Sequence, residues 1–235
     1  MKPPFLLLLL FFSSALLGSE RATLGVILFP PNVLIDEVTG ECRGHGIQTT
    51  REILAEYSIE IDVICAPPVR IYRLLENAEI DFTINIKSTK GLPEDVTFID
   101  KPYRILQLKL YSHLDRKNGK DVAAVRGFDY QGFRNKLIQQ EYRFFDLPNS
   151  ISSIQVFLKK RIPHLISYGG PYGYYIRDKK LKVSDAITST HLYSVPTHYT
   201  ITNKSPHLKA LIAAFDLYAD TYQVEYFKQK KLVNK

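Results

Sequence analysis

The chain has 235 residues, of which 45% are hydrophobic and 23% are charged. This length fits one large domain or two small lobes, and this composition excludes a disordered chain. The net charge is +7, but the basic residues are scattered apart from those in 228–235. Without zinc-ligand spacing or a basic helix, we predict a solvated basic surface and no nucleic-acid partner.

Residues 1–18 are typical of a secretory signal peptide. Lys2 precedes the apolar run 5–12, and small residues follow it. Cleavage after Ala15 and cleavage after Gly18 both fit this layout. The run is too short to span about 30 Å of hydrocarbon comfortably, although an uncleaved anchor is the alternative.

Alternating strands and helices are predicted for the first half of the chain. Apolar and β-branched residues predict strands over 23–29, 59–65 and 80–86. Helical spacing of apolar residues predicts helices over 46–57 and 69–77. Strands that alternate with helices indicate βαβ units and a mainly parallel sheet.

A second α/β series is predicted after a strand over 105–111. The further strands are predicted over 122–125, 142–145, 165–168 and 195–202, and the helices over 130–140, 150–160 and 207–226. Gly169-Gly170-Pro171 is read as a turn that tyrosines surround.

The two cysteines are Cys42 and Cys65. In an exported chain they are free to oxidise. A disulfide between them would add roughly 3 kcal/mol of stability by restricting the unfolded chain. Two buried free thiols are the alternative.

Several short motifs follow one another in a defined order along the chain. They are Pro30-Pro31, Thr39-Gly40-Glu41 with Gly44, Pro68-Val69-Arg70, Asn77-Ala78-Glu79-Ile80-Asp81, Val96-Thr97-Phe98 with Pro102-Tyr103, Ala124-Val125-Arg126-Gly127 and Ser205-Pro206-His207-Leu208. In this order they resemble the family 3 extracellular solute-binding proteins, the polar amino-acid type of ABC transporter receptor. The likeness spans nearly all of the chain after the leader.

This resemblance implies an α/β, two-lobed, periplasmic-binding-protein-like (type II) fold with two hinge crossovers. The chain then divides into a signal peptide (1–18), the first segment of lobe 1 (19–110), lobe 2 (111–194), and a return to lobe 1 with the C-terminal helix (195–235). The ligand is expected between the lobes, which close on it by a hinge.

The ligand site is predicted at the carboxyl ends of the strands. The side chains and helix starts at these ends offer an apolar wall, anion-binding groups, hydrogen-bonding groups and stacking tyrosines. Their structural alternatives are stiff turns, surface ion pairs, helix caps and core packing. The predicted ligand-binding residues are Phe29, Pro31, Arg70, Asn85, Ser88, Thr89, Arg126, Gly127, Tyr168 and Tyr172.

Two positions depart from the pattern of amino-acid binders in this family. Leu92 stands where they carry the arginine that grips the ligand carboxylate. Tyr168-Gly169-Gly170 stands where they place the aspartate for the ligand ammonium group. We therefore expect a small polar or anionic solute other than a conventional free α-amino acid. Candidate replacements for the missing arginine are Lys87, Lys90 and Arg126.

The resemblance implies a non-enzymatic, monomeric periplasmic receptor that needs no cofactor or metal and delivers its solute to an ABC permease. A sensing partner of a membrane receptor and a dehydratase-like enzyme on the same fold are the alternatives. The acid–base candidates form no recognisable catalytic arrangement, and common nucleophile and zinc motifs are absent from the sequence. Those candidates are Asp36, Glu41, His45, Glu94 and His164.

Overall fold

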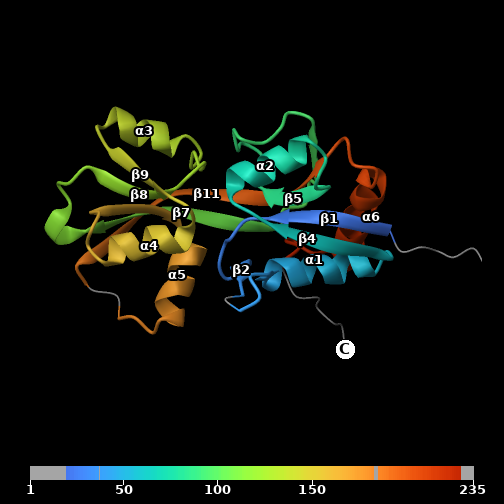
Figure 1. Cartoon of the computed structure of the whole chain (residues 1–235), viewed down its shortest axis with the longest axis horizontal. Helices are drawn as coiled ribbons and strands as arrows, with labels where there is room; N and C mark the ends of the chain where they lie inside the picture. Colours follow the sequence, from blue (N-terminus) through green and yellow to red (C-terminus); the bar gives the residue numbers. More distant parts are fainter. Residues whose placement is uncertain (1–19, 37, 183–184, 229–235) are drawn as a thin grey trace, which may run out of the picture.

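The computed structural model describes residues 20–36, 38–182 and 185–228. The predicted signal peptide, 1–18, lies outside this part of the chain. Within it, two α/β lobes lie side by side, and two long strands run from one lobe to the other (Figure 1). The two-lobed α/β fold expected from the sequence is confirmed.

Lobe 1 contains most of the first half of the chain and the C-terminal helix. Its elements are β1 (Glu20–Val26), β2 (Leu34–Ile35), β3 (Cys42–Arg43), α1 (His45–Ala55), β4 (Ile59–Cys65), α2 (Pro68–Glu76), β5 (Phe82–Asn85), β6 (Val96–Phe98) and α6 (Leu208–Tyr222). Strand β1 lies between β4 and β5 and is parallel to both.

Lobe 2 is formed by the middle of the chain. Its elements are β8 (Asp121–Val125), α3 (Phe133–Gln139), β9 (Arg143–Leu147), α4 (Ser150–Leu158), β10 (His164–Tyr168) and α5 (Gly169–Asp178). A short 3-10 helix, Leu114–Arg116, precedes β8. Strand β8 is parallel to both β9 and β10.

The strands that join the lobes are β7 (Arg104–His113) and β11 (Ile187–Thr202). They pair with each other in antiparallel fashion, and β11 then continues along β5 and β6 into lobe 1. The described strands therefore form one sheet in the order β4-β1-β5-β11-β7-β10-β8-β9, with β6 beside β11. The boundaries predicted after residues 110 and 194 fall inside β7 and β11, and they stay predictions.

Two expectations for the secondary structure were wrong. The sheet is mixed rather than mainly parallel, because β7 and β11 run between the lobes in opposite directions. The expected Gly-Gly-Pro turn is instead the start of helix α5. Proline fits the first turn of a helix because its missing N–H would have no partner there.

Each lobe has its own apolar core. In lobe 1, the rings of Tyr199 and Phe215 stack at 3.9 Å between centroids, and both side chains are fully buried. In lobe 2, the fully buried Phe157 and Leu165 contact the neighbouring strands and helices. Cys42 and Cys65 form a disulfide that ties β3 to the end of β4, with their Cα atoms 5.9 Å apart.

Among the helices in the described part of the chain, none is both long enough and apolar enough to cross a membrane.

Candidate functional site: a cavity between the lobes

A cavity of about 110 Å³ lies where the two lobes meet. Lobe 1 lines it with the segment after β1, part of α2 and the end of β5; the joining strands add Arg104, Leu106 and Thr197. Lobe 2 lines it with residues 128–131 and Tyr168. A solute in this space would contact both lobes and the strands that connect them.

The lobes touch each other around this cavity. The Ser88 hydroxyl donates a hydrogen bond to Oε1 of Gln131. Lys90 Nζ lies 3.9 Å from a carboxylate oxygen of Asp129. These polar contacts join the loop after β5 to the loop after β8, so they hold the two sides of the cavity together.

Aromatic rings form one wall. The ring of Phe29, from lobe 1, lies 5.7 Å from that of Tyr168, from lobe 2. Phe128 and Tyr130 extend this cluster, with centroids 5.7 Å apart. Burial raises the pKa of both Tyr130 and Tyr168, so their hydroxyls stay neutral at physiological pH.

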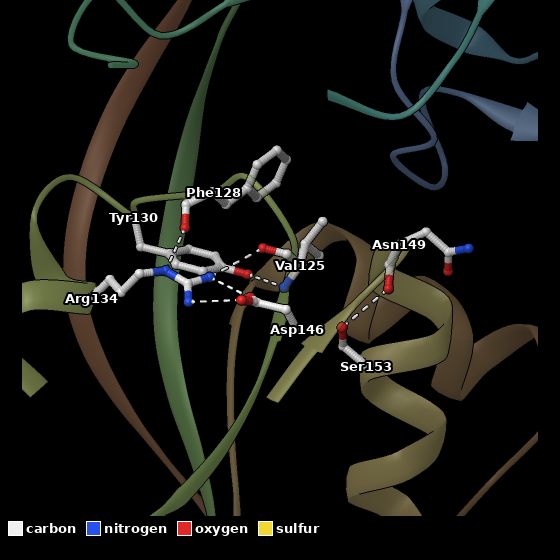
Figure 2. Close-up of polar contacts among 7 residues, drawn as sticks. All are labelled: Val125, Phe128, Tyr130, Arg134, Asp146, Asn149 and Ser153. Atoms are coloured by element: carbon white, nitrogen blue, oxygen red, sulfur yellow. Dashed lines mark hydrogen bonds and ion pairs between the residues drawn. The ribbon is translucent and has the colours of Figure 1, made fainter. Parts of the chain in front are cut away.

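Arg134 fixes the lobe 2 loop that carries these rings (Figure 2). Its Nε donates to the Phe128 carbonyl at 2.9 Å, and its Nη2 donates to the Asp146 carboxylate at 2.7 Å. The Tyr130 hydroxyl accepts a hydrogen bond from the Val125 N–H at 2.7 Å (Figure 2). The loop is therefore held from both ends before any solute arrives.

Helix α4, drawn beside this loop, begins with a capped turn. The Asn149 side chain accepts from the Ser152 N–H at 2.9 Å. The Ser153 hydroxyl donates to the Asn149 carbonyl at 3.1 Å (Figure 2). These bonds satisfy groups that the first turn of a helix leaves free.

Arg104 is the cation among the cavity-lining residues. Its Nε and Nη1 atoms are buried and have no hydrogen-bond partner within the described residues. Burial lowers the pKa of its guanidinium group. An arginine remains charged in proteins even so, which means that a half-buried cation with two buried, unused donor atoms faces the cavity.

Three neutral side chains of the lining also have unused polar atoms: Asn32 Oδ1, Asn85 Nδ2 and the Tyr103 hydroxyl. Asn85 lies near the Tyr72 hydroxyl and Thr49 near that of Tyr103, but no hydrogen bond of normal geometry joins either pair. Burial raises the pKa of Tyr103 to about 12, so its hydroxyl is neutral. Buried polar atoms without partners are uncommon in folded proteins, and their gathering at one cavity indicates a binding site.

The position of Asn32 depends on a glycine. The Gly46 N–H donates to the Asn32 carbonyl at 2.8 Å, which holds the loop after β1 against the start of α1. Gly44 has φ +136°, and a Cβ atom there would lie 2.5 Å from the same carbonyl oxygen. Only glycine allows this close approach without a shift of the loop.

Asp129 is the acid among the lining residues, and its oxygens already have partners. One oxygen accepts from the backbone N–H groups of Gln131 and Gly132, at 2.8 and 3.3 Å. The other faces Lys90. The cavity thus offers an unpaired cation and a paired acid.

The residues predicted from the sequence lie in several places. Phe29, Asn85, Thr89 and Tyr168 line the cavity, while Ser88 makes the inter-lobe bond to Gln131. Pro31 is next to the lining residue Asn32 and is itself outside the lining. Tyr172 stacks on Tyr111 at 4.0 Å in the lobe 2 core.

Arg70 and Arg126 line a different hollow at the seam between the lobes. Its other lining residues are Pro67, Pro68, Val69, Arg73 and Pro148. Gly127 has φ +82°, and a Cβ atom there would lie 3.0 Å from a methyl group of Val69 across the seam.

Of the three candidate replacements for the missing arginine, none lines the cavity. Lys87 faces Asp100 at 3.5 Å, Lys90 faces Asp129, and Arg126 lies at the seam hollow. Leu92 packs beside the α2 core of lobe 1. Arg104 was not among the residues predicted from the sequence, since it directly precedes the strand predicted over 105–111. The signal that was available is its place directly after the Pro102-Tyr103 motif, at the entry to that strand.

Comparison with known proteins shows the fold. Neither a protein-family model nor a characterised protein sequence matches the chain. A histidine kinase sensor domain with similarity to periplasmic binding proteins matches with a TM-score of 0.71 and 16% identity, over 92% of this chain and 96% of that one. An ancestral arginine-binding protein bound to arginine matches with a TM-score of 0.70 and 15% identity, over 86% and 92%.

The GluR0 ligand-binding core in complex with L-glutamate also matches, with a TM-score of 0.69 and 16% identity, over 92% of this chain and 99% of that one. The chain therefore has the type II fold of periplasmic binding proteins, matched along nearly its full length. Among the described residues, no group of three or more His, Cys, Asp or Glu side chains is placed to hold a metal ion.

Proposed function

We propose that this protein is a periplasmic solute-binding protein of the family 3 type, exported by the leader in 1–18. It captures a small polar or anionic solute between its lobes and presents it to an ABC-type permease. The observation that supports this proposal is the cavity lined by both lobes and by both joining strands, with buried polar atoms that lack partners. A site of this kind is completed by a ligand that contacts both lobes.

Sensing is the second candidate function, because one of the matched structures is a histidine kinase sensor domain. In that case the liganded lobe pair signals to a membrane receptor. A permease gene next to this one supports transport, and a sensor-kinase gene in its place supports sensing.

We propose that the protein is not an enzyme. The acid–base candidates Asp36, Glu41, His45, Glu94 and His164 are all outside the cavity lining. The carboxylate that does line the cavity, Asp129, is already engaged by two backbone N–H groups and by Lys90. General acid–base chemistry needs such a group within hydrogen-bond reach of the reacting atoms. The solute is therefore expected to be recovered unchanged after incubation with the protein, and a new product in its NMR spectrum would contradict this.

Thermal unfolding of the chain 19–235 tests solute capture. The panel contains amino acids, sugars, polyamines, organic acids and aromatic acids. A solute that binds only the folded state raises the Tm with increasing concentration. The proposal fails if no solute in the panel raises the Tm.

Leu106→Trp provides a variant with a filled cavity. Leu106 is buried in the lining, so an indole there occupies the solute's space, and the Tm rise should disappear. Leu217→Trp is the matched control, since Leu217 is 55% exposed on α6. A full Tm rise in Leu106→Trp would place the bound solute outside this cavity.

A further inference from the structure

We propose that the cavity binds a small carboxylate that has an apolar, ring-sized body and no α-ammonium group, and that Arg104 holds its carboxylate. This inference rests on the proposed function, and it specifies the ligand of the same site. It also names a residue that replaces the carboxylate-binding arginine missing at Leu92.

The first argument is the state of Arg104. Two of its donor atoms, Nε and Nη1, are buried without partners at the cavity, although the carboxylate of Asp129 is part of the same lining. A buried charge without a partner destabilises the folded protein, and a buried donor without an acceptor adds to that cost. A carboxylate removes both costs, because the planar guanidinium group matches its two oxygens.

A second cation strengthens the preference for an anion. Lys228 is half-buried, and its backbone N–H donates to the Tyr103 carbonyl at 3.1 Å, next to Arg104 in the chain. Burial and the positive charge of Arg104 lower the pKa of the Lys228 ammonium group. The two side chains therefore repel each other, and a bound anion would relieve that repulsion.

The site has no free acid for an ammonium group. The carboxylate of Asp129 is engaged by two backbone N–H groups and by Lys90. The unpaired acceptors in the lining are Asn32 Oδ1 and the Tyr103 hydroxyl, which are neutral oxygens that suit a hydroxyl group or water. An ammonium group entering this cavity would lose its water without gaining a free carboxylate, which is unfavourable.

The remaining walls fit an apolar body. Phe29, Phe128 and Leu106 face the space, and the neutral tyrosines Tyr130 and Tyr168 complete it. The cavity volume of about 110 Å³ is close to the size of an engineered cavity of about 150 Å³ that binds benzene. Aromatic walls favour a ring through offset or edge-to-face contacts.

Three compounds that share a phenylethyl unit separate the contributions of the two charged groups. 3-Phenylpropionate has the carboxylate alone, 2-phenylethylamine has the amine alone, and L-phenylalanine has both. Isothermal titration of each into the chain 19–235 should give binding of 3-phenylpropionate at least tenfold tighter than that of L-phenylalanine. The amine should not bind measurably.

Variants of Arg104 identify the group that holds the carboxylate. Arg104→Met should weaken 3-phenylpropionate binding at least tenfold, and Arg104→Lys should weaken it less, because the charge remains without the planar fork. Arg73→Met is the matched control, since Arg73 is an exposed arginine of the seam hollow and should keep the wild-type affinity. Circular dichroism and the Tm of each variant confirm that it is folded.

Failure of this inference is distinguishable from failure of the proposed function. The inference is overturned if L-phenylalanine binds as tightly as 3-phenylpropionate, or if Arg104→Met keeps the wild-type affinity. It is also overturned if 3-phenylpropionate does not bind while another solute of the broad panel raises the Tm. In these cases solute capture stands. If no solute raises the Tm, both fail.

Discussion

Arg104 lines the cavity, Arg134 fixes a loop that lines it, and the two arginines are in opposite states. Every nitrogen of the Arg134 guanidinium group donates a hydrogen bond, with the carbonyls of Phe128 and Val125 and the carboxylate of Asp146 as acceptors. Arg104 leaves Nε and Nη1 without acceptors, although they are buried. The first arginine builds the wall of the cavity, and the second faces the space that the wall encloses.

This difference distinguishes a charged side chain that stabilises the fold from a charged side chain that is available to bind a ligand. A buried charge with all its partners inside the protein is explained by folding alone. A buried charge without partners reduces stability, so it is retained where something other than folding uses it. Replacing Arg134 should therefore lower the stability of the fold. Replacing Arg104 should lower the affinity for the solute and leave the stability unchanged or higher.

The largest effect is expected from Arg134→Met. This substitution removes the hydrogen bonds that hold residues 128–130 and leaves Asp146 without its ion pair. We expect a loss of about 2 kcal/mol in the free energy of unfolding, because the pair is partly exposed to solvent. Chemical denaturation measures it, and Lys136→Met on the same helix is the control. A loss below about 0.5 kcal/mol would mean that Arg134 does not fix the loop.

Arg104→Met tests the other half of the comparison in the absence of solute. Removing an unpaired buried charge should leave the free energy of unfolding unchanged or raise it by about 1 kcal/mol. The measurement is the same denaturation experiment, with Arg104→Lys as the variant that keeps the charge. A clear loss of stability in Arg104→Met alone would reveal a partner for this guanidinium in the folded protein.

Lys90→Met should change the specificity of the cavity rather than its stability. Without Lys90, the carboxylate of Asp129 keeps its backbone donors but loses its cation. The affinity for L-phenylalanine relative to 3-phenylpropionate should rise roughly twofold to fivefold, in line with an exposed ion pair. Competition titrations measure this ratio. Lys87→Met, which removes the partner of Asp100 instead, should leave the ratio unchanged.

The smallest effect is expected from pH. Burial lowers the pKa of His164, whose ring nitrogens bond to the Ser112 hydroxyl and the Gly119 carbonyl. A histidine with a lowered pKa in the folded state is protonated first in the unfolded state. The stability contribution is therefore complete above pH 6.5 and falls as the pH drops from there toward the folded pKa. Tm measurements between pH 8 and pH 5 should show this fall, and His164→Gln should reduce it.

The fold could be predicted from the sequence because each motif is a local pattern that can be recognised in the chain, and the motifs follow one another in a defined order. Strands, helix starts and turn residues are each specified by neighbours in the chain, and most of the predicted elements exist within a few residues. The helix α5 was missed because Gly169 and Gly170 suggested a turn. The mixed sheet was missed because the pairing of β7 with β11 joins segments far apart in the sequence.

The site was predictable only in part. Phe29, Asn85, Thr89 and Tyr168 were found because the carboxyl ends of strands meet at one edge of a sheet. Arg70 and Arg126 also lie at strand ends, but they line the seam hollow and not the cavity. Arg104 is unpaired because the described parts of the two lobes bring no acceptor to its Nε and Nη1 atoms. Such an arrangement of distant segments cannot be predicted from the residues next to Arg104 in the sequence.

The pairing of β7 with β11 makes the two crossings a single ribbon, and Arg104 stands on it, opposite Thr197. A ribbon of two hydrogen-bonded strands resists stretching and sliding but twists readily, so relative movement of the lobes is a rotation about it. Points near an axis of rotation travel least, and the Ser88–Gln131 and Lys90–Asp129 contacts lie on the loops that would travel most. An entering solute would therefore meet the anchoring cation in nearly its final position and gain the outer contacts afterwards. Capture would proceed from the floor of the cavity to its rim, and release would proceed in the reverse order.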